Sequence, residues 1–205
     1  MAARKILPRS FYLDSPDVVA RRLLGKLVTR HIGDERLKEG QRLTGRIVEI
    51  EAYLGLDDPA AHAYAGKTAR NAVLFGPPGF AYVYFIYGMH YCLNFSCQPE
   101  GHGAGVLIRA LEPVEGLDTM ARLRKLPASA SPRLLTSGPG RLCQALDITR
   151  AAHNGLDVTS RSSILQVLDD GYEPDLIRSS PRIGISKAVE HPLRFVIEGN
   201  AFVSR

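Results

Sequence analysis

Polar and apolar residues alternate in two segments of this chain with the period of two that is typical of a β-strand. The first segment, IVEIEAY at 47–53, carries its apolar residues on one face and two carboxylates with an aromatic ring on the other. The two faces consist of Val48, Ile50 and Ala52, and of Glu49, Glu51 and Tyr53. Solvated glutamates are the simplest explanation, because an unpaired carboxylate is costly to bury. The alternative is that this face is used for chemistry.

The second alternating segment, YVYFIYGMHYCLN, begins at Tyr82 and predicts a β-hairpin. Gly88 interrupts the alternation, and glycine adopts the positive φ of a tight reversal without a steric penalty. Tyr87 and Met89 would then stand at the tip, where a large side chain has little protein to pack against. Core or cross-strand packing is the simpler explanation for Tyr82 and for Phe85.

The rest of the chain contains signals for further strands and helices. A proline at the first helical position and a closing Gly25 bound a short helix that begins at Pro16. Further strands are expected at 26–31, 42–53, 106–111, 164–168 and 193–197, and further helices at 113–126 and 137–146. The stretch 54–79 is expected to run over the surface with short helical turns.

Length and composition are those of a single-domain globular protein. The 205 residues can bury one full hydrophobic core, and we expect 1–205 to form one domain. The apolar runs are too short to span a bilayer, and MAARKILPRS lacks the apolar stretch of a secretory signal. These features predict a cytoplasmic protein with no membrane contact.

The cysteines give no sign of a disulfide framework or a metal site. Cys92, Cys97 and Cys143 are odd in number and lack Cys-x-x-Cys spacing. Adding His102 to the first two gives a spacing that fits no common zinc pattern. We therefore expect buried thiols and no bound metal.

The charge of the chain favours a nucleic-acid partner. The formal net charge is +5, and 20 arginines stand against six lysines. Arginine suits bidentate contact with phosphate, although a merely solvated basic surface is the alternative. Arg109 is the lone charge in an apolar strand, where it either snorkels from an edge or reaches a phosphate or a carboxylate. The N–H groups that open the helix at 137–146 are a second candidate for holding an anion.

Five segments, in order along nearly the whole chain, resemble the alkyladenine DNA glycosylase family, also called 3-methyladenine or N-methylpurine DNA glycosylases. They are VEIEAYLG with AAH at 48–62, YVYFIYGMHYCLN at 82–94, RALEPVEGL from Arg109, SGPGRLCQAL from Ser137, and PRIGI with PLRF near the end. The resemblance implies a mixed α/β (α+β) fold, a single domain built on a mainly antiparallel, curved sheet with flanking helices and a protruding β-hairpin. It also implies base excision repair. Such an enzyme binds damaged double-stranded DNA, flips a damaged purine out of the duplex and hydrolyses its N-glycosidic bond.

The resemblance also implies catalytic roles for three residues. Glu51 matches the general base that activates the attacking water, and Arg109 matches an arginine that holds this water and the nearby phosphate. The backbone carbonyl of Ile183 is similar to a third ligand of the water. Glu49 has no such role and keeps a structural interpretation.

A second set of residues matches the family's contacts with the flipped base and the duplex. The pocket for the base would be lined by Tyr53, His62, Tyr84 and Asn94, of which Asn94 disfavours normal guanine. Tyr87 is similar to the family's intercalating tyrosine, and Met89 flanks it. The loop after His62 is one residue shorter than the family pattern and carries Tyr64. This difference leaves open the ranking of 3-methyladenine, 7-methylguanine, hypoxanthine and ethenoadenine.

Water, rather than an amine, is the nucleophile that the resemblance implies. A glycosylase that also cuts the strand needs an activated amine, and nothing marks Lys67 as one. We therefore expect a monofunctional enzyme that leaves an abasic site, needs no cofactor and acts as a monomer in association with the nucleoid.

Two other functions compete with this interpretation. A carbohydrate glycosidase could use Glu49 and Glu51 as its carboxylate pair, but such enzymes normally place the two groups on opposite sides of the sugar. A non-catalytic module could bind nucleic acid through exposed tyrosines. In that case Glu51 could be replaced without consequence.

Overall fold

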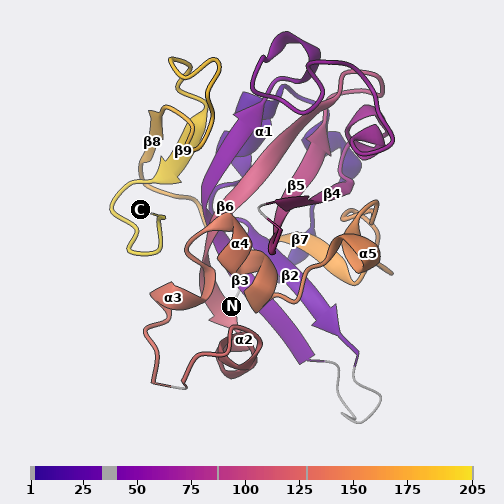
Figure 1. Ribbon diagram of the computed structural model, residues 1–205. Helices are drawn as coiled ribbons and strands as arrows, with labels where there is room; N and C mark the ends of the chain where they lie inside the picture. The colour runs from indigo at the N-terminus through magenta and orange to yellow at the C-terminus, as the bar shows by residue number, and fades with distance from the viewer. Residues whose placement is uncertain (1–2, 34–40, 87, 128, 205) are drawn as a thin grey trace.

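The computed structural model describes residues 3–33, 41–86, 88–127 and 129–204, and within these ranges nine strands form one sheet (Figure 1). The strands are β1 (Lys5–Ile6), β2 (Leu27–Ile32), β3 (Gln41–Tyr53), β4 (Ala81–Ile86), β5 (His90–Cys97), β6 (Ala104–Glu115), β7 (Leu165–Asp169), β8 (Ile177–Ser180) and β9 (Arg194–Ile197). Seven of them lie in the order β1-β7-β2-β3-β6-β5-β4, β9 pairs with β3 and β8 pairs with β9, and every pairing is antiparallel. The predicted mixed α/β (α+β) class with an antiparallel sheet is confirmed.

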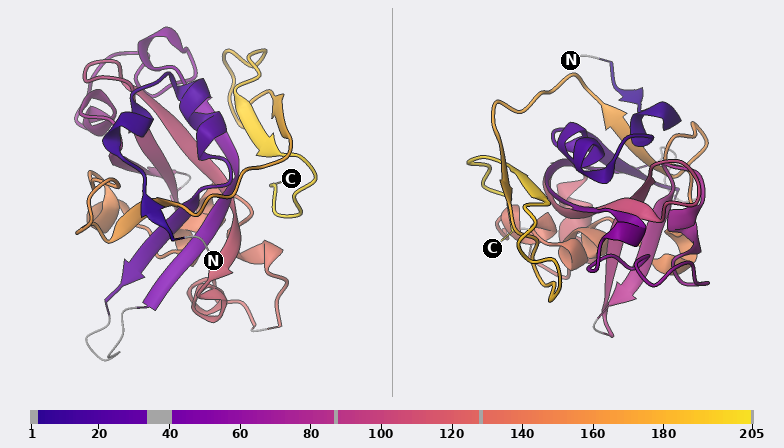
Figure 2. Two further views of the ribbon diagram at one scale, coloured as in Figure 1. Left: turned by 180° about the vertical axis from the view of Figure 1, so that it is seen from behind. Right: turned by 90° about the horizontal axis from the view of Figure 1, so that it is seen from above.

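Short helices lie on both faces of this sheet. They are α1 (Pro16–Leu23), α2 (Leu117–Leu123), α3 (Arg133–Thr136), α4 (Pro139–Ala145) and α5 (Arg150–His153), with the 3₁₀ turns η1 (Arg9–Tyr12), η2 (Gly55–Asp57) and η3 (Ala72–Phe75). Helix α1 packs on β3 and β6 from one side and α4 packs on β5 and β6 from the other (Figures 1 and 2). None of the helices in the described ranges is long and apolar enough to cross a membrane.

The central strand β3 shares one of its edges between two partners. Strand β2 pairs with its first half, from Gln41 to Arg46, and β9 pairs with Glu49 to Glu51. The other edge of β3 pairs with β6 along most of its length. Strand β9 and the segment before it therefore lie beside the end of β3 that carries the carboxylates.

Strand β6 is longer than the sequence predicted, and the helix after it is shorter. The strand continues from Leu111 to Glu115 through Pro113, where β5 no longer pairs with it and the missing N–H of a proline is tolerated. Gly116 then takes a φ of 80°, and α2 begins at the next residue rather than at Pro113. A Cβ on Gly116 would lie 2.7 Å from the carbonyl oxygen of Arg42, so only glycine fits this turn.

The hairpin of β4 and β5 projects from the body of the molecule, as the family resemblance implied (Figure 2, right). Its base is part of the core, where Phe95 is fully buried. Phe85 is instead 46% exposed and packs across the strands against Tyr91, with ring centroids 5.1 Å apart. Of the two placements predicted for Phe85, the cross-strand contact is confirmed and the place in the core is wrong. Cys92, Cys97 and Cys143 are free and buried, as predicted.

Two phenylalanines of the hairpin allow a matched test of this core. Phe95→Ala is expected to lower the free energy of unfolding by about 3–5 kcal/mol, because it opens a cavity in the sheet. Phe85→Ala removes the same atoms from a half-exposed site and is expected to cost about 1 kcal/mol. Urea-induced unfolding followed by circular dichroism measures both. Equal losses in the two variants would contradict this placement of the core.

Candidate active site

Glu51 lies near the end of β3, where its side chain is fully buried and contacts three other groups. The backbone N–H of Ile183 donates to Oε1 at 2.7 Å, and the Tyr53 hydroxyl donates to Oε2 at 3.0 Å. The guanidinium of Arg109 approaches Oε1 with Nη1 at 3.3 Å. The structure therefore brings the predicted base, the predicted arginine and the predicted segment at Ile183 together.

A β-bulge in β6 directs Arg109 toward this cluster. Ile50 of β3 lies opposite Ile108 of β6. The next pair along the strands is Glu49 with Ala110, so Arg109 has no partner in the register. An extra residue of this kind twists the strand locally and re-aims its side chain. The bulge explains how the lone charge of an apolar strand comes to lie among carboxylates.

Glu49 is also fully buried, which corrects the prediction of a solvated glutamate. Its Oε1 accepts from Arg109 Nε at 2.8 Å and from Arg194 Nε at 2.8 Å. Ser204 donates from its backbone N–H at 2.6 Å and from its hydroxyl at 2.8 Å. Glu49 is still interpreted as structural, but as a buried, ion-paired carboxylate and not a solvated one, because both faces of β3 are covered.

The two carboxylates on this strand have opposite pKa shifts. Burial raises the pKa of Glu49, but hydrogen bonds from Arg194 and Ser204 outweigh burial, and the pKa falls below its ordinary value. For Glu51 burial dominates over Arg109 and over the amide of Ile183, so its pKa lies above the ordinary value. Glu49 is therefore held as an anion, while Glu51 is a carboxylate that can take up a proton more readily.

A pocket of about 160 Å³ is lined by all four residues predicted to hold a base, and one of them, Tyr53, is the tyrosine whose hydroxyl donates to Glu51. The four are Tyr53, His62, Tyr84 and Asn94. The rings of His62 and Tyr84 meet edge to face, with centroids 4.5 Å apart. The amide of Asn94 donates to the carbonyl of Tyr82 at 3.1 Å, which fixes its orientation. The pocket thus combines flat walls with one oriented amide.

Tyr82 was predicted to be structural, and the structure gives it a second role. It is buried, as predicted, but it also lines the pocket, and its hydroxyl lies 3.0 Å from Nδ1 of His62. Burial lowers the pKa of His62, and Arg70 lowers it further, so the imidazole is neutral near pH 7. Period-two alternation put Tyr82 and Tyr84 on one face, and this is the signal that could have assigned both to the pocket.

Arg182 is a buried residue of the site that the sequence did not single out. Its guanidinium forms an ion pair with Asp58 and donates to the carbonyl of Ala52 at 3.0 Å. The same group lies over the Tyr53 ring, 4.7 Å from its centroid. Arg182 thereby fixes the segment that carries Ile183, and the next two residues of that segment line the pocket.

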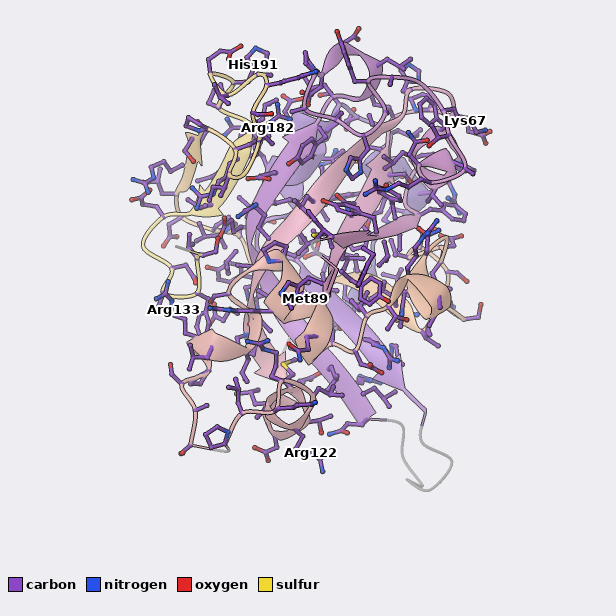
Figure 3. The ribbon with its side chains drawn as sticks, in the orientation of Figure 1. Lys67, Met89, Arg122, Arg133, Arg182 and His191 are labelled. Carbon is purple, nitrogen blue, oxygen red and sulfur yellow. The ribbon has the colours of Figure 1, made fainter. Side chains whose placement is uncertain are left out.

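The structure describes one of the two residues predicted to intercalate into DNA. Met89 is 70% exposed at the end of the hairpin (Figure 3). Tyr87 lies outside the described residues. Lys67 is exposed in the loop after His62 (Figure 3) and is not among the residues that line the pocket. Within the described ranges, no group of three or more His, Cys, Asp or Glu is placed to hold a metal ion.

Comparison with known proteins shows the family of this chain. The family model described as methylpurine-DNA glycosylase (MPG) matches residues 10–201. The chain belongs to this family. A provisionally named 3-methyladenine DNA glycosylase of Koribacter versatilis is 55% identical over 199 residues, which cover 97% of this chain and 92% of that protein. Relatives with the same name in Burkholderia lata and Methanoculleus marisnigri are 46% and 47% identical, over 97% of this chain and 91% and 98% of theirs.

Membership of the methylpurine-DNA glycosylase family confirms the resemblance found in the sequence motifs. It makes the protein a DNA glycosylase, a hydrolase of N-glycosyl bonds that acts in base excision repair. Its nucleic-acid partner is accordingly damaged DNA, in agreement with the arginine bias of the chain.

Glu49→Gln tests the buried ion cluster. The substitution is expected to lower the free energy of unfolding by about 3–5 kcal/mol near pH 7, because the buried Arg109 and the partly buried Arg194 lose a carboxylate partner. The pKa of Glu49 is depressed, so its stabilisation is present above the unfolded value of about 4.3 and is lost as the pH falls through the lower folded value. The difference between the two proteins should therefore shrink at low pH in urea titrations.

Glu198→Gln is the matched control. Glu198 pairs with Arg178 at 3.0 Å, but its side chain is 38% exposed, and the expected loss is below about 1 kcal/mol. If Glu49→Gln cost no more than this control, the buried cluster would not be a stabilising element.

Proposed function

We propose that the enzyme flips alkylated or deaminated purines into the pocket beside Glu51 and hydrolyses the N-glycosidic bond with water that this carboxylate activates. The substrates are 3-methyladenine, 7-methylguanine, hypoxanthine and ethenoadenine. The observation that carries the proposal is a fully buried carboxylate with a raised pKa, hydrogen-bonded to the tyrosine that forms a wall of an aromatic pocket.

The pocket suits a flat base removed from the helix. Stacking on aromatic side chains contributes about 1–3 kcal/mol per base, which offsets the few kcal/mol lost when the base leaves the duplex. Tyr53, His62 and Tyr84 provide aromatic faces, and a purine alkylated on a ring nitrogen carries a positive charge that such faces attract. Asn94, held by the carbonyl of Tyr82, would clash with the exocyclic amino group of normal guanine.

Glu51 is the general base of the proposed reaction. An ionised Glu51 takes a proton from water as the bond to the base breaks, and its charge also stabilises the oxocarbenium-like sugar. Arg109 lies 3.3 Å from Glu51 and helps to hold the water and the neighbouring phosphate. The carbonyl of Ile183 is the third proposed ligand of the water, since the N–H of the same residue already donates to Glu51.

Water attack leaves an abasic site and an uncut strand. None of the described residues that line the pocket is a lysine, so those residues supply no amine to form a Schiff base. We therefore propose a monofunctional glycosylase that acts as a monomer. In the flipped complex, Tyr87 with the exposed Met89 would fill the gap left in the helix.

The environment of Glu49 argues against a carbohydrate glycosidase. Its two oxygens accept from Arg109, Arg194 and Ser204, and its pKa is depressed. A carboxylate held in this way is a poor general acid and has no free side to offer a sugar. Glu51 is left as the only carboxylate of this strand that can take part in the chemistry.

Glu51→Gln separates catalysis from binding. The variant is expected to bind duplex DNA with a lesion as the parent does and to release free base about 10²–10⁴ times more slowly, because it cannot deprotonate water. Duplexes with each of the four lesions are incubated under single-turnover conditions and then treated with mild alkali to cut abasic sites. Strand cutting when the alkali is omitted would contradict a monofunctional enzyme. Full activity of Glu51→Gln would instead support a non-catalytic binding module.

The pH dependence of base release should report the ionisation of Glu51. As the general base, Glu51 must be ionised, and its pKa is raised. The single-turnover rate of base release is therefore expected to fall with decreasing pH around a midpoint above the ordinary carboxyl value of about 4.3. Arg109 lowers the pKa of Glu51, and Arg109→Gln should therefore move the midpoint to higher pH. An unchanged midpoint would assign the acid limb to another group, such as His62.

A further inference from the structure

Three carboxylates of the candidate active site are each paired with an arginine. The ion pairs join Glu49 and Glu51 to Arg109, Glu49 also to Arg194, and Asp58 to Arg182. His62, which lines the base pocket, is neutral near pH 7, because burial and then Arg70 lower its pKa. With Glu51 ionised, three carboxylates face three arginines, and the charges of this group cancel.

Arg70 adds a positive charge to these neutral surroundings. Its guanidinium lies over the ring of Tyr84, 5.7 Å from the centroid, and Tyr84 is a wall of the base pocket. Burial raises the pKa of the neighbouring Tyr82, and the charge of Arg70 lowers it in part. Among the ion pairs between described residues, none includes Arg70. Its charge therefore acts on the pocket without a carboxylate to cancel it.

Hydrogen bonds within the loop that follows His62 keep Arg70 near the pocket. Asn71 is only 2% exposed, and its amide donates to the carbonyl of His62 at 2.9 Å and to that of Gly66 at 3.0 Å. Its Oδ1 accepts from the backbone N–H of Thr68 at 2.6 Å. This buried side chain ties the two ends of the loop together, so the backbone of Arg70 is held beside an anchored residue.

A second tyrosine of the pocket provides a comparison within the same site. Arg182 lies over the ring of Tyr53, 4.7 Å from the centroid, but its guanidinium is fully buried and bound to Asp58. The opposite charges of this pair largely cancel at the distance of a base in the pocket. Two walls of the pocket thus carry an arginine on the ring, and of these two arginines only Arg70 lacks a carboxylate partner among the described residues.

The four lesions proposed as substrates fall into two charge classes. In DNA, 3-methyladenine and 7-methylguanine are cations, because a ring nitrogen is alkylated, whereas hypoxanthine and ethenoadenine are neutral. In each reaction the electron pair of the C1′–N9 bond passes to the base, water oxygen bonds to C1′, and Glu51 takes the water proton. The charge of the base therefore falls by one in all four reactions. A fixed positive charge nearby favours that change equally, and it distinguishes the classes because it repels only a base that arrives as a cation.

We propose that Arg70 is a specificity-determining residue that favours the neutral lesions, hypoxanthine and ethenoadenine, over the cationic lesions, 3-methyladenine and 7-methylguanine. Aromatic faces attract cations, but the guanidinium of Arg70 already covers the ring of Tyr84. Two unit charges several ångströms apart near a protein surface repel each other enough to change an equilibrium by about threefold to tenfold. The proposal rests on the proposed function and adds a ranking of its substrates.

Competition between two lesions tests the charge of Arg70. Duplexes of the same sequence, one with 7-methylguanine and one with hypoxanthine, are mixed with limiting enzyme, and the two released bases are measured. The ratio of their kcat/KM values, 7-methylguanine over hypoxanthine, should be about threefold to tenfold higher in Arg70→Gln than in the parent. Arg70→Lys keeps the charge and should keep the parent's ratio. A parent-like ratio in Arg70→Gln, or the same shift in Arg70→Lys, would overturn the proposal.

The same ratio separates this role from a contact with the DNA backbone. If Arg70 only held a phosphate, its loss would weaken the reaction of both lesions alike, and the ratio would stay at the parent's value. Lys67→Gln is the matched control, because Lys67 is an exposed cation of the same loop and does not line the pocket (Figure 3). Its ratio should be that of the parent. An equal shift in Lys67→Gln would assign the effect to overall charge and contradict the role of Arg70.

A pair of neutral lesions tests charge against shape. Ethenoadenine and hypoxanthine differ in size but not in charge, so their kcat/KM ratio should be the same in Arg70→Gln and in the parent. A change in this ratio as large as the change for 7-methylguanine would show that the side chain selects by shape, and the proposal would be wrong.

Base release by Glu51→Gln distinguishes this proposal from the proposed function. If Glu51→Gln released base at the parent's single-turnover rate, the proposed mechanism would fail whatever the ratio in the Arg70 variants. If Glu51→Gln lost base release while Arg70→Gln kept both base release and the parent's ratio, only the role of Arg70 would fail. The first failure appears in a rate and the second in a ratio of two lesions.

Discussion

The rest of the structure depends on a buried ion cluster at the centre of the sheet. Glu49 and Glu51 are fully buried on β3, and Arg109 bridges them from β6. Charges in a protein interior are unfavourable by several kcal/mol per ion unless each is paired and hydrogen-bonded. This constraint explains why separate parts of the chain converge here: the bulge of β6, strand β9 through Arg194, and Ser204. The active site is built on the need to neutralise these two carboxylates.

The cluster also separates two chemically identical residues into different roles. Glu49 has its oxygens occupied by donors and is held as an anion, whereas Glu51 has fewer partners and a raised pKa. One carboxylate holds Arg109, and the other is the one proposed to exchange a proton with water. The proposed hydrolysis with one activated water needs this inequality, because two fully paired carboxylates would leave no base and two unpaired ones would destabilise the fold.

The base pocket is formed by segments that lie far apart in the sequence. Its walls come from the end of β3, the loop around His62, the hairpin and the segment after Arg182. Arg182 joins the last of these to Asp58 across 124 residues of sequence, and its guanidinium covers the Tyr53 ring.

The sequence by itself predicted many of the elements and named most residues of the proposed site. Periodicity predicted the hairpin, β3, α1 and α4, because alternation and capping are local properties, and the ordered motifs named Glu51, Tyr53, His62, Tyr84, Asn94 and Arg109 before any geometry was known. Only the tertiary structure decided that Glu49 is buried, that Arg109 is the extra residue of a bulge, and that Tyr82 and Arg182 belong to the site. Burial, strand register and ion pairing depend on which distant segments cover a residue. A charge on an alternating strand looks the same in the sequence whether water or an arginine lies above it.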